Sequence, residues 1–412
     1  MNSVLKAFLR LLFTAFMGAF CVNCAYADHS RNSSGYISAA ADGGRIRLLW
    51  TNRADGGNKL LFMKSEDDGS TWSEEKSPAG QGPHKFFSPS LSSAGNTLHA
   101  CWVDYGVNGN GDIRYLRSPD GGTTWDRELV LVDESDGTLS LKVFSFGADV
   151  HLTWRNTQGK MFIKSSYNNG ETWKENVYIG QTSRFEDYNN PPELFKRDSE
   201  ILYVWDDAGK DTAGIQAYVD VIPLLRGGSN LVSLIGYRTS ADNGKTWSRK
   251  TEFLAKLVEP KEDFIDMQYP CVKLNNGLFH MFWAAKLYRS RYELFYRRFS
   301  ENPKLLIKEK KVAEYSETVP RASCEAAGSG IYACWLKIQD GSGEIRFVKS
   351  IDAGVTWQNE IALSDKGSYM SPVIIASPAG KLHVFYGTDT GETIDIKCKT
   401  SSDNGETWTE PK

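Results

Sequence analysis

One eight-residue pattern, Ser-x-Asp-x-Gly-x-Thr-Trp, limits this chain to repeat architectures. Three of the five gaps between consecutive copies are roughly 50 residues, a period typical of proteins built from small stacked units, and the gap from Trp173 to Trp247 is longer because of an insertion. The gap between Trp247 and Trp357 is about twice that period, which indicates one degenerate copy between them, and the stretch Arg291–Tyr296 followed by Ser300–Pro303 fits that place. The copies are Ser65–Trp72, Ser118–Trp125, Ser166–Trp173 (with Asn168 in place of Asp), Ser240–Trp247, Ser350–Trp357 and Ser401–Trp408.

Each octet has the composition of a tight hairpin turn. The Asp side chain can accept hydrogen bonds from backbone N–H groups of the turn, and Gly adopts the positive φ that other residues resist. The Trp that follows supplies a large apolar ring to bury beneath the turn. Acidic, Gly-bearing loops also occur in calcium sites, but a further Glu near the twelfth position and flanking helices do not recur here. We therefore expect no metal site and no cofactor.

Alternating strands accompany every octet. One strand runs directly into the octet, and the strand before it ends in an aromatic residue. Four strands per unit, with no convincing helix, predict an all-β fold: a β-propeller of about seven four-stranded blades, with a six-bladed ring as the alternative. The seven aromatic residues are Trp50, Trp102, Trp154, Trp205, Trp283, Trp335 and Tyr386.

The N-terminus has the features of a secretory signal. Lys6 and Arg10 precede an apolar run from Leu11 to Val22, and Ala25-Tyr26-Ala27 is a cleavage site of the A-x-A kind. We expect a signal peptide at 1–27, a single propeller domain at 28–412, and a periplasmic or secreted protein. The last octet lies close to the end of the sequence, so Asp28–Tyr36 is expected to supply the missing outer strand of the last blade.

Charge and cysteine content narrow the possible partners. The chain has 48 Lys and Arg against 51 Asp and Glu, and no basic block, so we expect no nucleic-acid partner. No apolar stretch after the leader is long enough to span a membrane.

Five cysteines follow Ala27, so at least one stays unpaired within the chain. Cys324 and Cys334 flank the turn around Gly328, so a disulfide across that hairpin is plausible in an oxidising compartment.

Four histidines occupy equivalent places in different units. His99, His151, His280 and His383 each lie three residues before the aromatic residue that ends the second strand. Their recurrence follows from the repeat, so it does not indicate a catalytic or metal-binding set.

The loops most suited to function lie opposite the octet turns. In a propeller, the loops between strands two and three and the links between blades share one face, where binding residues are commonly held. Mixed charges there suit a sugar, another polar ligand, or a protein partner. An apolar insertion at 206–236 in the fourth unit should cover part of this face. The candidate ligand-binding residues are Arg53, Asp104, Arg155, Asp206 and Arg321.

The octets resemble the Asp box, or BNR repeat, of the sialidase superfamily. Members of that family bind the substrate carboxylate with three arginines, use a Tyr paired with a Glu as nucleophile, and use an Asp as acid/base. The first of these arginines normally lies in a Phe/Tyr-Arg-Ile-Pro stretch. Here the matching region reads Asn32-Ser33-Ser34-Gly35, and Asp55 matches the family's acid/base only loosely.

The resemblance implies a sialidase-like propeller that is not a typical sialidase, because the arginine clamp is missing and seven repeats replace the family's six. We therefore expect an exported propeller that binds a carbohydrate or protein partner on its loop face. The alternative is an exo-acting glycoside hydrolase of sialidase type, with Asp55 as its acid/base.

Overall fold

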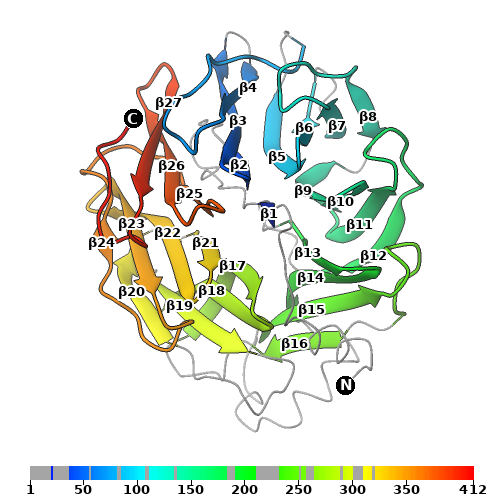
Figure 1. Ribbon diagram of the computed structural model, residues 1–412. Coiled ribbons are helices and arrows are strands. Elements are labelled where there is room, and N and C mark those ends of the chain that lie inside the picture. Colours follow the sequence, from blue (N-terminus) through cyan, green and yellow to red (C-terminus); the bar gives the residue numbers. More distant parts are fainter. Residues whose placement is uncertain are drawn as a thin grey trace, which may run out of the picture.

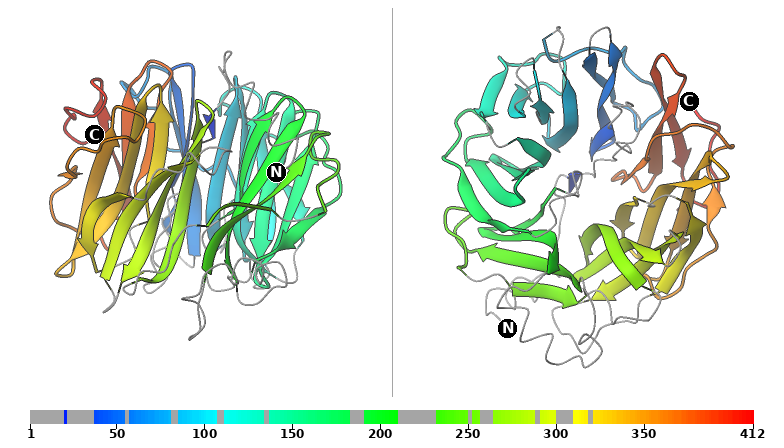
Figure 2. Two further views of the ribbon diagram at one scale, coloured as in Figure 1. Left: turned by 90° about the horizontal axis from the view of Figure 1, so that it is seen from below. Right: turned by 180° about the vertical axis from the view of Figure 1, so that it is seen from behind.

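The computed structural model describes residues 20–21, 37–54, 57–80, 85–106, 111–133, 137–182, 191–209, 232–249, 252–256, 264–287, 291–299, 310–317 and 321–412. These residues form seven small antiparallel sheets arranged in a ring around a central axis, so the predicted seven-bladed propeller is confirmed (Figure 1). Figure 2 shows the same ring from the side and from behind. No helix long and apolar enough to span a membrane occurs in this described part of the chain.

The first three blades follow the chain in order. Their strands are β1 (Phe20–Cys21), β2 (Ile37–Asp42), β3 (Arg45–Ala54) and β4 (Gly57–Ser65), then β5 (Phe86–Ala94), β6 (Thr97–Asp104), β7 (Asp112–Ser118) and β8 (Leu129–Val132), and then β9 (Thr138–Phe146), β10 (Asp149–Asn156), β11 (Lys160–Ser166) and β12 (Val177–Gln181).

The remaining four blades complete the ring. Their strands are β13 (Glu193–Arg197), β14 (Glu200–Gly209), β15 (Val232–Ser240) and β16 (Glu252–Lys256); β17 (Phe264–Asn275), β18 (Leu278–Leu287), β19 (Arg291–Phe299) and β20 (Lys310–Ser316); β21 (Ser323–Ala327), β22 (Gly330–Gln339), β23 (Ser342–Ser350) and β24 (Ile361–Ala362); and β25 (Val373–Ala376), β26 (Leu382–Asp389) and β27 (Ile394–Ser401).

The seven aromatic residues predicted to end the second strands all lie in those strands and are buried. Each of six of them joins an apolar cluster with the preceding blade: Trp50 with the seventh, Trp102 with the first, Trp154 with the second, Trp205 with the third, Trp335 with the fifth and Tyr386 with the sixth. Successive sheets are thus held face to face by buried apolar surface, which is what closes a row of small sheets into a ring.

The last sheet has three described strands. The backbone of Lys412 pairs with that of Cys398 in β27 through two hydrogen bonds, so the chain begins an outer strand at its last described residue. The predicted closing strand at Asp28–Tyr36 lies outside the described residues. So do the octet remnant Ser300–Pro303 and most of the insertion at 206–236, whose flanking strands β14 and β15 pair as far as Gly209 and Val232.

The six octets share one hydrogen-bond pattern. The Ser hydroxyl donates to the Asp (or Asn168) Oδ1 at 2.7 to 2.9 Å and accepts the Gly N–H at 2.7 to 3.0 Å. The same Oδ1 accepts the Thr N–H at 2.8 to 2.9 Å. The octet glycines have φ between 78° and 87°, as the turn requires. The predicted role of the Asp and Gly in each octet is confirmed.

Five of the octet turns also dock on the blade before them through their Trp. The ring packs edge-on against an aromatic ring there, in the pairs Trp72–Phe385, Trp125–Phe62, Trp173–Tyr115, Trp357–Tyr296 and Trp408–Phe347, whereas Trp247 packs against Tyr203 of its own blade. In four of these octets the Gly lies against the same ring, so the missing Cβ is what permits the close approach; they are Gly122, Gly170, Gly354 and Gly405. The octets therefore connect blades as well as strands.

Replacing Gly354 by Ala should destabilise the fold by about 3 kcal/mol, from a left-handed backbone plus an overpacked contact. A Cβ at Gly354 (φ 82°) would overlap the Tyr296 ring and hydroxyl, whereas a Cβ at Gly391 (φ 91°) meets nothing within 4 Å. Gly391→Ala is thus the matched control, with an expected loss of about 1 kcal/mol from strain alone. Urea unfolding measures both, and equal losses would show that the contact with Tyr296 is not tight.

One position of the first strand takes part in five of the seven junctions between blades. It lies opposite the residue before the second-strand aromatic, and it is Ser38, Ser90, Lys142, Glu193, Cys271, Ser323 or Val373 in successive blades. The three serine hydroxyls accept the backbone N–H of Leu91, Val143 and Ile374 in the following blade at 3.0 to 3.1 Å. These bonds satisfy N–H groups on an inner sheet edge that has no neighbouring strand.

At two junctions this position carries a stronger connection. Lys142 of the third blade binds Glu193 of the fourth, with Nζ 2.6 and 2.9 Å from the two carboxylate oxygens. Cys271 of the fifth blade forms a disulfide with Cys324 of the sixth. The expected Cys324–Cys334 disulfide is therefore wrong. Cys334 lies opposite Ser323, one residue from Cys324, and because successive side chains alternate between the faces of a sheet, the two thiols point to opposite sides.

Candidate functional site

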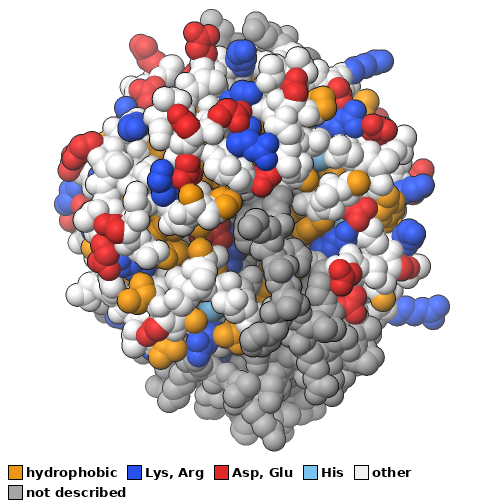
Figure 3. All heavy atoms as spheres, viewed as in Figure 1, with side chains coloured by type: hydrophobic (Ala, Val, Ile, Leu, Met, Phe, Trp, Pro, Cys, Tyr) orange, Lys and Arg blue, Asp and Glu red, His pale blue; other side chains and the backbone are white. Residues whose placement is uncertain are grey.

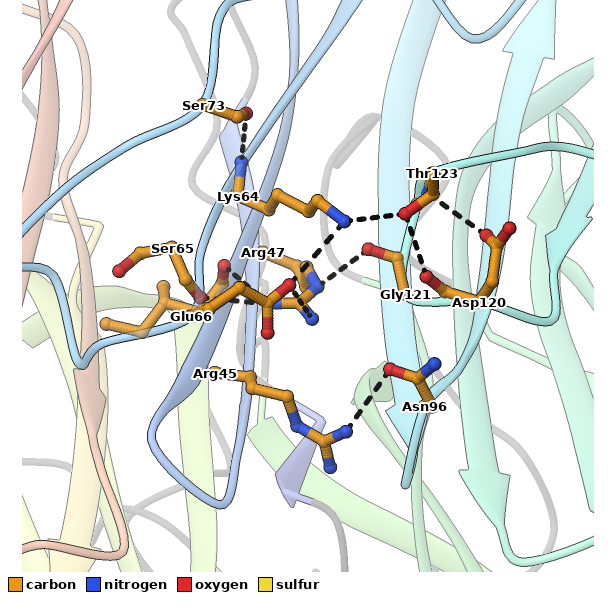
Figure 4. Close-up of polar contacts among 12 residues, drawn as sticks. Arg45, Arg47, Lys64, Ser65, Glu66, Ser73, Asn96, Asp120, Gly121 and Thr123 are labelled. Carbon is orange, nitrogen blue, oxygen red and sulfur yellow. Dashed lines mark hydrogen bonds and ion pairs between the residues drawn. The ribbon is translucent and has the colours of Figure 1, made fainter.

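The octet face of the ring is occupied by contacts between blades (Figure 4). At the junction of the first two blades, the Arg47 guanidinium donates to the Gly121 carbonyl at 3.1 Å and Lys64 Nζ donates to Thr123 Oγ1 at 2.8 Å. Other junctions repeat this arrangement, with Arg117 on the Asn169 carbonyl and Lys349 on the Asn404 carbonyl. The cations of this face thus mainly hold octet turns in place.

The four recurring histidines belong to the same docking system. His99 Nδ1 lies 2.9 Å from Tyr115 Oη, His280 Nδ1 lies 2.8 Å from Tyr296 Oη, and His383 Nε2 lies 3.1 Å from the octet carboxylate of Asp68. Burial lowers the pKa of His99 to about 4, of His151 to about 3 and of His280 to about 4. These are neutral core histidines, each in a separate blade.

On the loop face, Arg53 closes the ring. Its guanidinium binds both carboxylate oxygens of Asp389 in the seventh blade, at 2.8 and 2.7 Å, and also the Gly391 carbonyl. The bond to Asp389 raises the pKa of Arg53, and the bond from Arg53 lowers the pKa of Asp389. Beside this pair, the Asn52 amide exchanges two hydrogen bonds with the backbone of Ile394. Arg53 thus joins the first and last blades and is partly exposed, and its role in ligand binding stays a prediction.

Asp104 lies in an ionic cluster of the second blade. It is buried, accepts the Gly106 N–H at 2.9 Å, and lies 3.6 Å from Arg114 Nε. Asp112 and Glu128 also approach Arg114, each at 3.5 Å. Burial raises the pKa of Asp112, with further contributions from neighbouring carboxylates. Asp104 therefore takes part in a cluster of the second blade that is separate from the Arg53–Asp389 pair.

The other predicted residues are dispersed. Arg321 is partly buried just before β21, in the link to the sixth blade. Asp206 lies in β14, where its backbone pairs with Ile235, and its side chain lies outside the described residues. Asp55 also lies outside them. The described residues thus bring no three of the predicted ligand residues together.

Arg155 instead belongs to a polar region on the side of the third blade that faces the fourth. Ser140 lies opposite Arg155 and Lys142 lies opposite Thr153 in the pairing of β9 with β10, and residues opposite each other share a face of the sheet. That face is turned toward the fourth blade, because Thr153 Oγ1 donates to the Pro192 carbonyl at 2.9 Å and Lys142 binds Glu193. Arg155 is 1% exposed and lies close enough to Tyr203 for its charge to act on that phenol.

Three side chains around Arg155 hold polar atoms without a partner. Thr138 Oγ1, Ser140 Oγ and Asn156 Nδ2 are buried and make no hydrogen bond in the described structure. The side-chain oxygen Oδ1 of Asn156, by contrast, accepts hydrogen bonds from the backbone N–H groups of Gln158 and Lys160. Leaving a buried polar group unpaired costs about 1–3 kcal/mol, so three at neighbouring positions of the β9–β10 pairing require an explanation. We call Thr138, Ser140, Arg155 and Asn156 the blade 3 polar cluster.

Sequence reasoning singled out Arg155 among these four residues, from its place in the loop that follows the second strand. It missed Thr138 and Ser140, which lie in a first strand. A signal was present: the alternation Thr138-Leu-Ser140-Leu-Lys142 puts polar side chains on one face of that strand. Alternation alone does not reveal that a hydroxyl lacks a partner, because partners come from other strands.

Comparison with solved structures agrees with this fold. An ulvan lyase of polysaccharide lyase family 25, bound to -[GlcA(1-4)Rha3S]-, is similar with a TM-score of 0.59 and 13% identity, covering 93% of this chain and 95% of that one. An α-L-arabinofuranosidase of Fusarium graminearum has a TM-score of 0.47 at 13% identity, covering 74% and 89%, and the Hadza microbial sialidase Hz136 has 0.44 at 14%, covering 85% and 73%.

No family model matches the chain, and no curated protein matches its sequence. The likeness to the lyase extends over nearly the whole of both chains, and at this identity it shows the fold alone. A carbohydrate-active enzyme, the ulvan lyase, is therefore among the proteins whose fold this chain shares.

Proposed function

We propose that this protein binds an acidic polysaccharide on its loop face, at the blade 3 polar cluster. The observation that carries the proposal is the set of three buried, unpaired polar groups around Arg155. A fold keeps such groups at a cost in stability, and binding sites are where that cost is commonly found. The first-strand serines Ser90 and Ser92, by contrast, both bond to the next blade.

The chemistry of the cluster suits an acidic sugar. Hydroxyl and amide groups match sugar hydroxyls, and a guanidinium matches a carboxylate or sulfate, which it can bind through two parallel hydrogen bonds. The lyase of similar fold was solved with a saccharide containing glucuronate and sulfated rhamnose, which supports this class of ligand over a protein partner. The charged groups on the face seen in Figure 3 are interspersed, so recognition would depend on local groups rather than on one large basic patch.

Thr138→Val and Ser140→Ala should each raise the melting temperature while weakening polysaccharide binding. Removing an unpaired buried hydroxyl relieves a cost of about 1 kcal/mol or more, and the same change removes a group that the ligand needs. Calorimetric titration with uronate-containing, sulfated and neutral polysaccharides measures affinity, and thermal unfolding measures stability.

Ser92→Ala provides the matched control. Ser92 is a buried first-strand serine whose hydroxyl is bonded to Ser145 at 2.7 Å, so its loss should lower stability and leave affinity unchanged. Binding that survives both Thr138→Val and Ser140→Ala would remove the site. Failure of the unaltered protein to bind any acidic polysaccharide would remove the function.

Cleavage of the bound polysaccharide is the second candidate, favoured by the likeness to a lyase over almost the full length. The hydrolase of sialidase type, with Asp55 as acid/base, remains a prediction within this candidate. Incubation with acidic polysaccharides, fluorogenic sialosides and other aryl glycosides separates the possibilities. Elimination produces unsaturated sugar ends, hydrolysis releases reducing ends or the fluorophore, and pure binding gives neither.

We also infer that the protein is exported. The predicted signal peptide and the Cys271–Cys324 disulfide both support an oxidising compartment. Residues Phe20–Cys21 of that leader pair with β2 in the full chain, so cleavage after Ala27 would remove β1. N-terminal sequencing of the protein recovered from the periplasm or the medium checks this: a start at Asp28 supports export, and retention of Met1 contradicts it.

A further inference from the structure

Four Asn–Gly pairs lie in the described chain, and their environments differ sharply. Three are in octets: Asn169–Gly170, Asn243–Gly244 and Asn404–Gly405. The fourth, Asn276–Gly277, forms the two-residue turn between β17 and β18. We propose that Asn276 is a site of spontaneous deamidation, and that the octet serine protects the other three asparagines from the same reaction.

The reaction needs a free backbone nitrogen after the asparagine. The glycine nitrogen, losing its proton to base, attacks Asn Cγ; the N–Cγ bond forms, the Cγ–Nδ2 bond breaks, and ammonia leaves. Water then opens the resulting five-membered imide at either carbonyl, producing aspartate or isoaspartate. The net change is amide plus water to carboxylate plus ammonium, with no oxidation or reduction. Glycine favours ring closure because it carries no Cβ to obstruct the approach.

The octets restrain that nitrogen. The N–H groups of Gly170, Gly244 and Gly405 donate to the hydroxyls of Ser166, Ser240 and Ser401 at 3.0, 2.8 and 2.7 Å. All three glycines are buried, and Gly170 and Gly405 lie against the rings of Tyr115 and Phe347. The nitrogen can reach the side chain only after the turn breaks this bond and leaves its docking site on the preceding blade.

The asparagine side chains of the octets are restrained as well. Asn243 Nδ2 donates to Asp149 Oδ2 at 2.8 Å, and Asn169 Nδ2 to Thr97 Oγ1 at 3.3 Å, in each case a residue of another blade. Ring closure would require these bonds to break together with the bond to serine. Octet asparagines therefore react only through local unfolding.

At Asn276 the nitrogen is unrestrained. Asn276 is exposed, both residues are left-handed (φ 49° and 74°), and the Gly277 N–H has no acceptor among the described residues. This is the geometry of a type I′ hairpin turn, which leaves that N–H facing solvent. The Asn276 amide makes one contact, donating to the Gly328 carbonyl of the next blade at 3.1 Å.

Deamidation would alter that contact. A carboxylate in place of the amide puts two acceptors against each other at Gly328, and isoaspartate lengthens the backbone of a tight turn. The Asn275 side chain also donates to the Gly328 carbonyl, at 2.9 Å. After deamidation of Asn276, this hydrogen bond between the fifth and sixth blades would remain. The reaction therefore adds negative charge and loosens one turn while leaving the disulfide between these blades intact.

The test is peptide mapping by mass spectrometry of folded protein held for days in mildly alkaline buffer. We expect Asn276 to gain the mass of amide hydrolysis at least roughly tenfold faster than the octet asparagines, because these react only through local opening. Denatured protein should show comparable rates at all four. Reaction of an octet asparagine ahead of Asn276 in the folded protein would overturn the proposal.

A pair of variants isolates the role of the serine. Ser401→Ala frees the Gly405 N–H, so Asn404 should deamidate several-fold faster, whereas Ser402→Ala, an exposed neighbour that does not bond to Gly405, should change nothing. Equal rates at Asn404 in both variants would contradict protection by the serine. If Ser401→Ala does not fold, the comparison of Asn276 with Asn404 in the unaltered chain still decides the proposal.

Discussion

Lowering the pH from 7 to 4 should reduce the free energy of unfolding by several kcal/mol. Burial lowers the pKa of His99 and His280 to about 4 and of His151 to about 3, and the pKa of His383 is lowered as well. A histidine in an unfolded chain titrates near pH 6.5, so below that value the unfolded chain binds more protons. The stabilisation is complete above pH 6.5 and is lost as the pH falls toward 4.

The size of this effect follows from the shifts. One pKa unit corresponds to about 1.4 kcal/mol, so the free energy of unfolding should fall by at most about 3 kcal/mol for each of the three deeply buried histidines by pH 4. Protonated His99 and His151 would each bury a cationic N–H at Nε2, which has no partner in the described structure. A total of this size is comparable to the whole stability of a typical domain, so we expect unfolding near pH 4.

The octet aspartates add a second phase at lower pH. Hydrogen bonds from Thr71 and Ser65 lower the pKa of Asp67 to about 2, and similar bonds lower the pKa of Asp120 and Asp352 to about 2. Because these folded-state values lie below those of an unfolded chain, their contribution is present above pH 4 and disappears as the pH falls toward 2. Protonation of the histidines and protonation of the octet aspartates therefore both lower the free energy of unfolding as the pH falls.

Urea unfolding at a series of pH values measures the loss, and His99→Gln provides the control. Glutamine can keep a hydrogen bond to Tyr115 but does not titrate, so this variant should show a shallower fall of stability between pH 6.5 and 4. An unfolding free energy that stays constant over that range would mean that the histidines are hydrated in the folded state.

Removing the Cys271–Cys324 disulfide should cost about 4 kcal/mol. The bond closes a loop with a sequence separation of 53, and loop entropy in the unfolded chain sets this magnitude. The double variant Cys271→Ala/Cys324→Ala avoids leaving a single buried thiol, and urea unfolding of oxidised protein measures the difference.

Cys334→Ala is the matched control, because Cys334 is equally buried but unbonded. It should cost about 1 kcal/mol, the loss of one buried sulfur. Peptide mapping without reduction should recover Cys271 joined to Cys324, with Cys101, Cys334 and Cys398 as free thiols. A cost for Cys334→Ala as large as that of the double variant would favour the hairpin pairing instead.

The fold could be predicted from the sequence because its main determinants are local. The octet is a turn whose Ser, Asp, Gly and Thr satisfy one another within eight residues, as in Ser65–Trp72, so its copies can be counted without knowing what surrounds them. The second-strand aromatics follow the same repeat, and even the decayed copy could be placed, since β19 lies at Arg291–Phe299.

The disulfide and the candidate site could not be predicted in the same way, because both depend on which residues of different blades become neighbours. Cys271 and Cys324 meet across a blade junction, whereas the hairpin partner Cys334 is closer in sequence and faces the other side of its sheet. The sequence alone did not show that Arg53, a candidate ligand residue, pairs with Asp389 from the far end of the chain. Thr138 and Ser140 stand out only once the surrounding strands are known to offer them no partner.

The contacts between first strands of neighbouring blades differ from junction to junction, and this limits how the number of blades could change. Proteins with internal repeats can lose or gain a unit by unequal recombination, which works best when every joint accepts every neighbour. Here Lys142 needs the carboxylate of Glu193, and Cys271 needs the thiol of Cys324, while the serine joints need only a backbone N–H. Deleting the fourth blade would leave Lys142 buried without its carboxylate, and deleting the sixth would leave Cys271 without its disulfide partner. We therefore expect blades to be gained or lost only at the junctions that a serine hydroxyl makes.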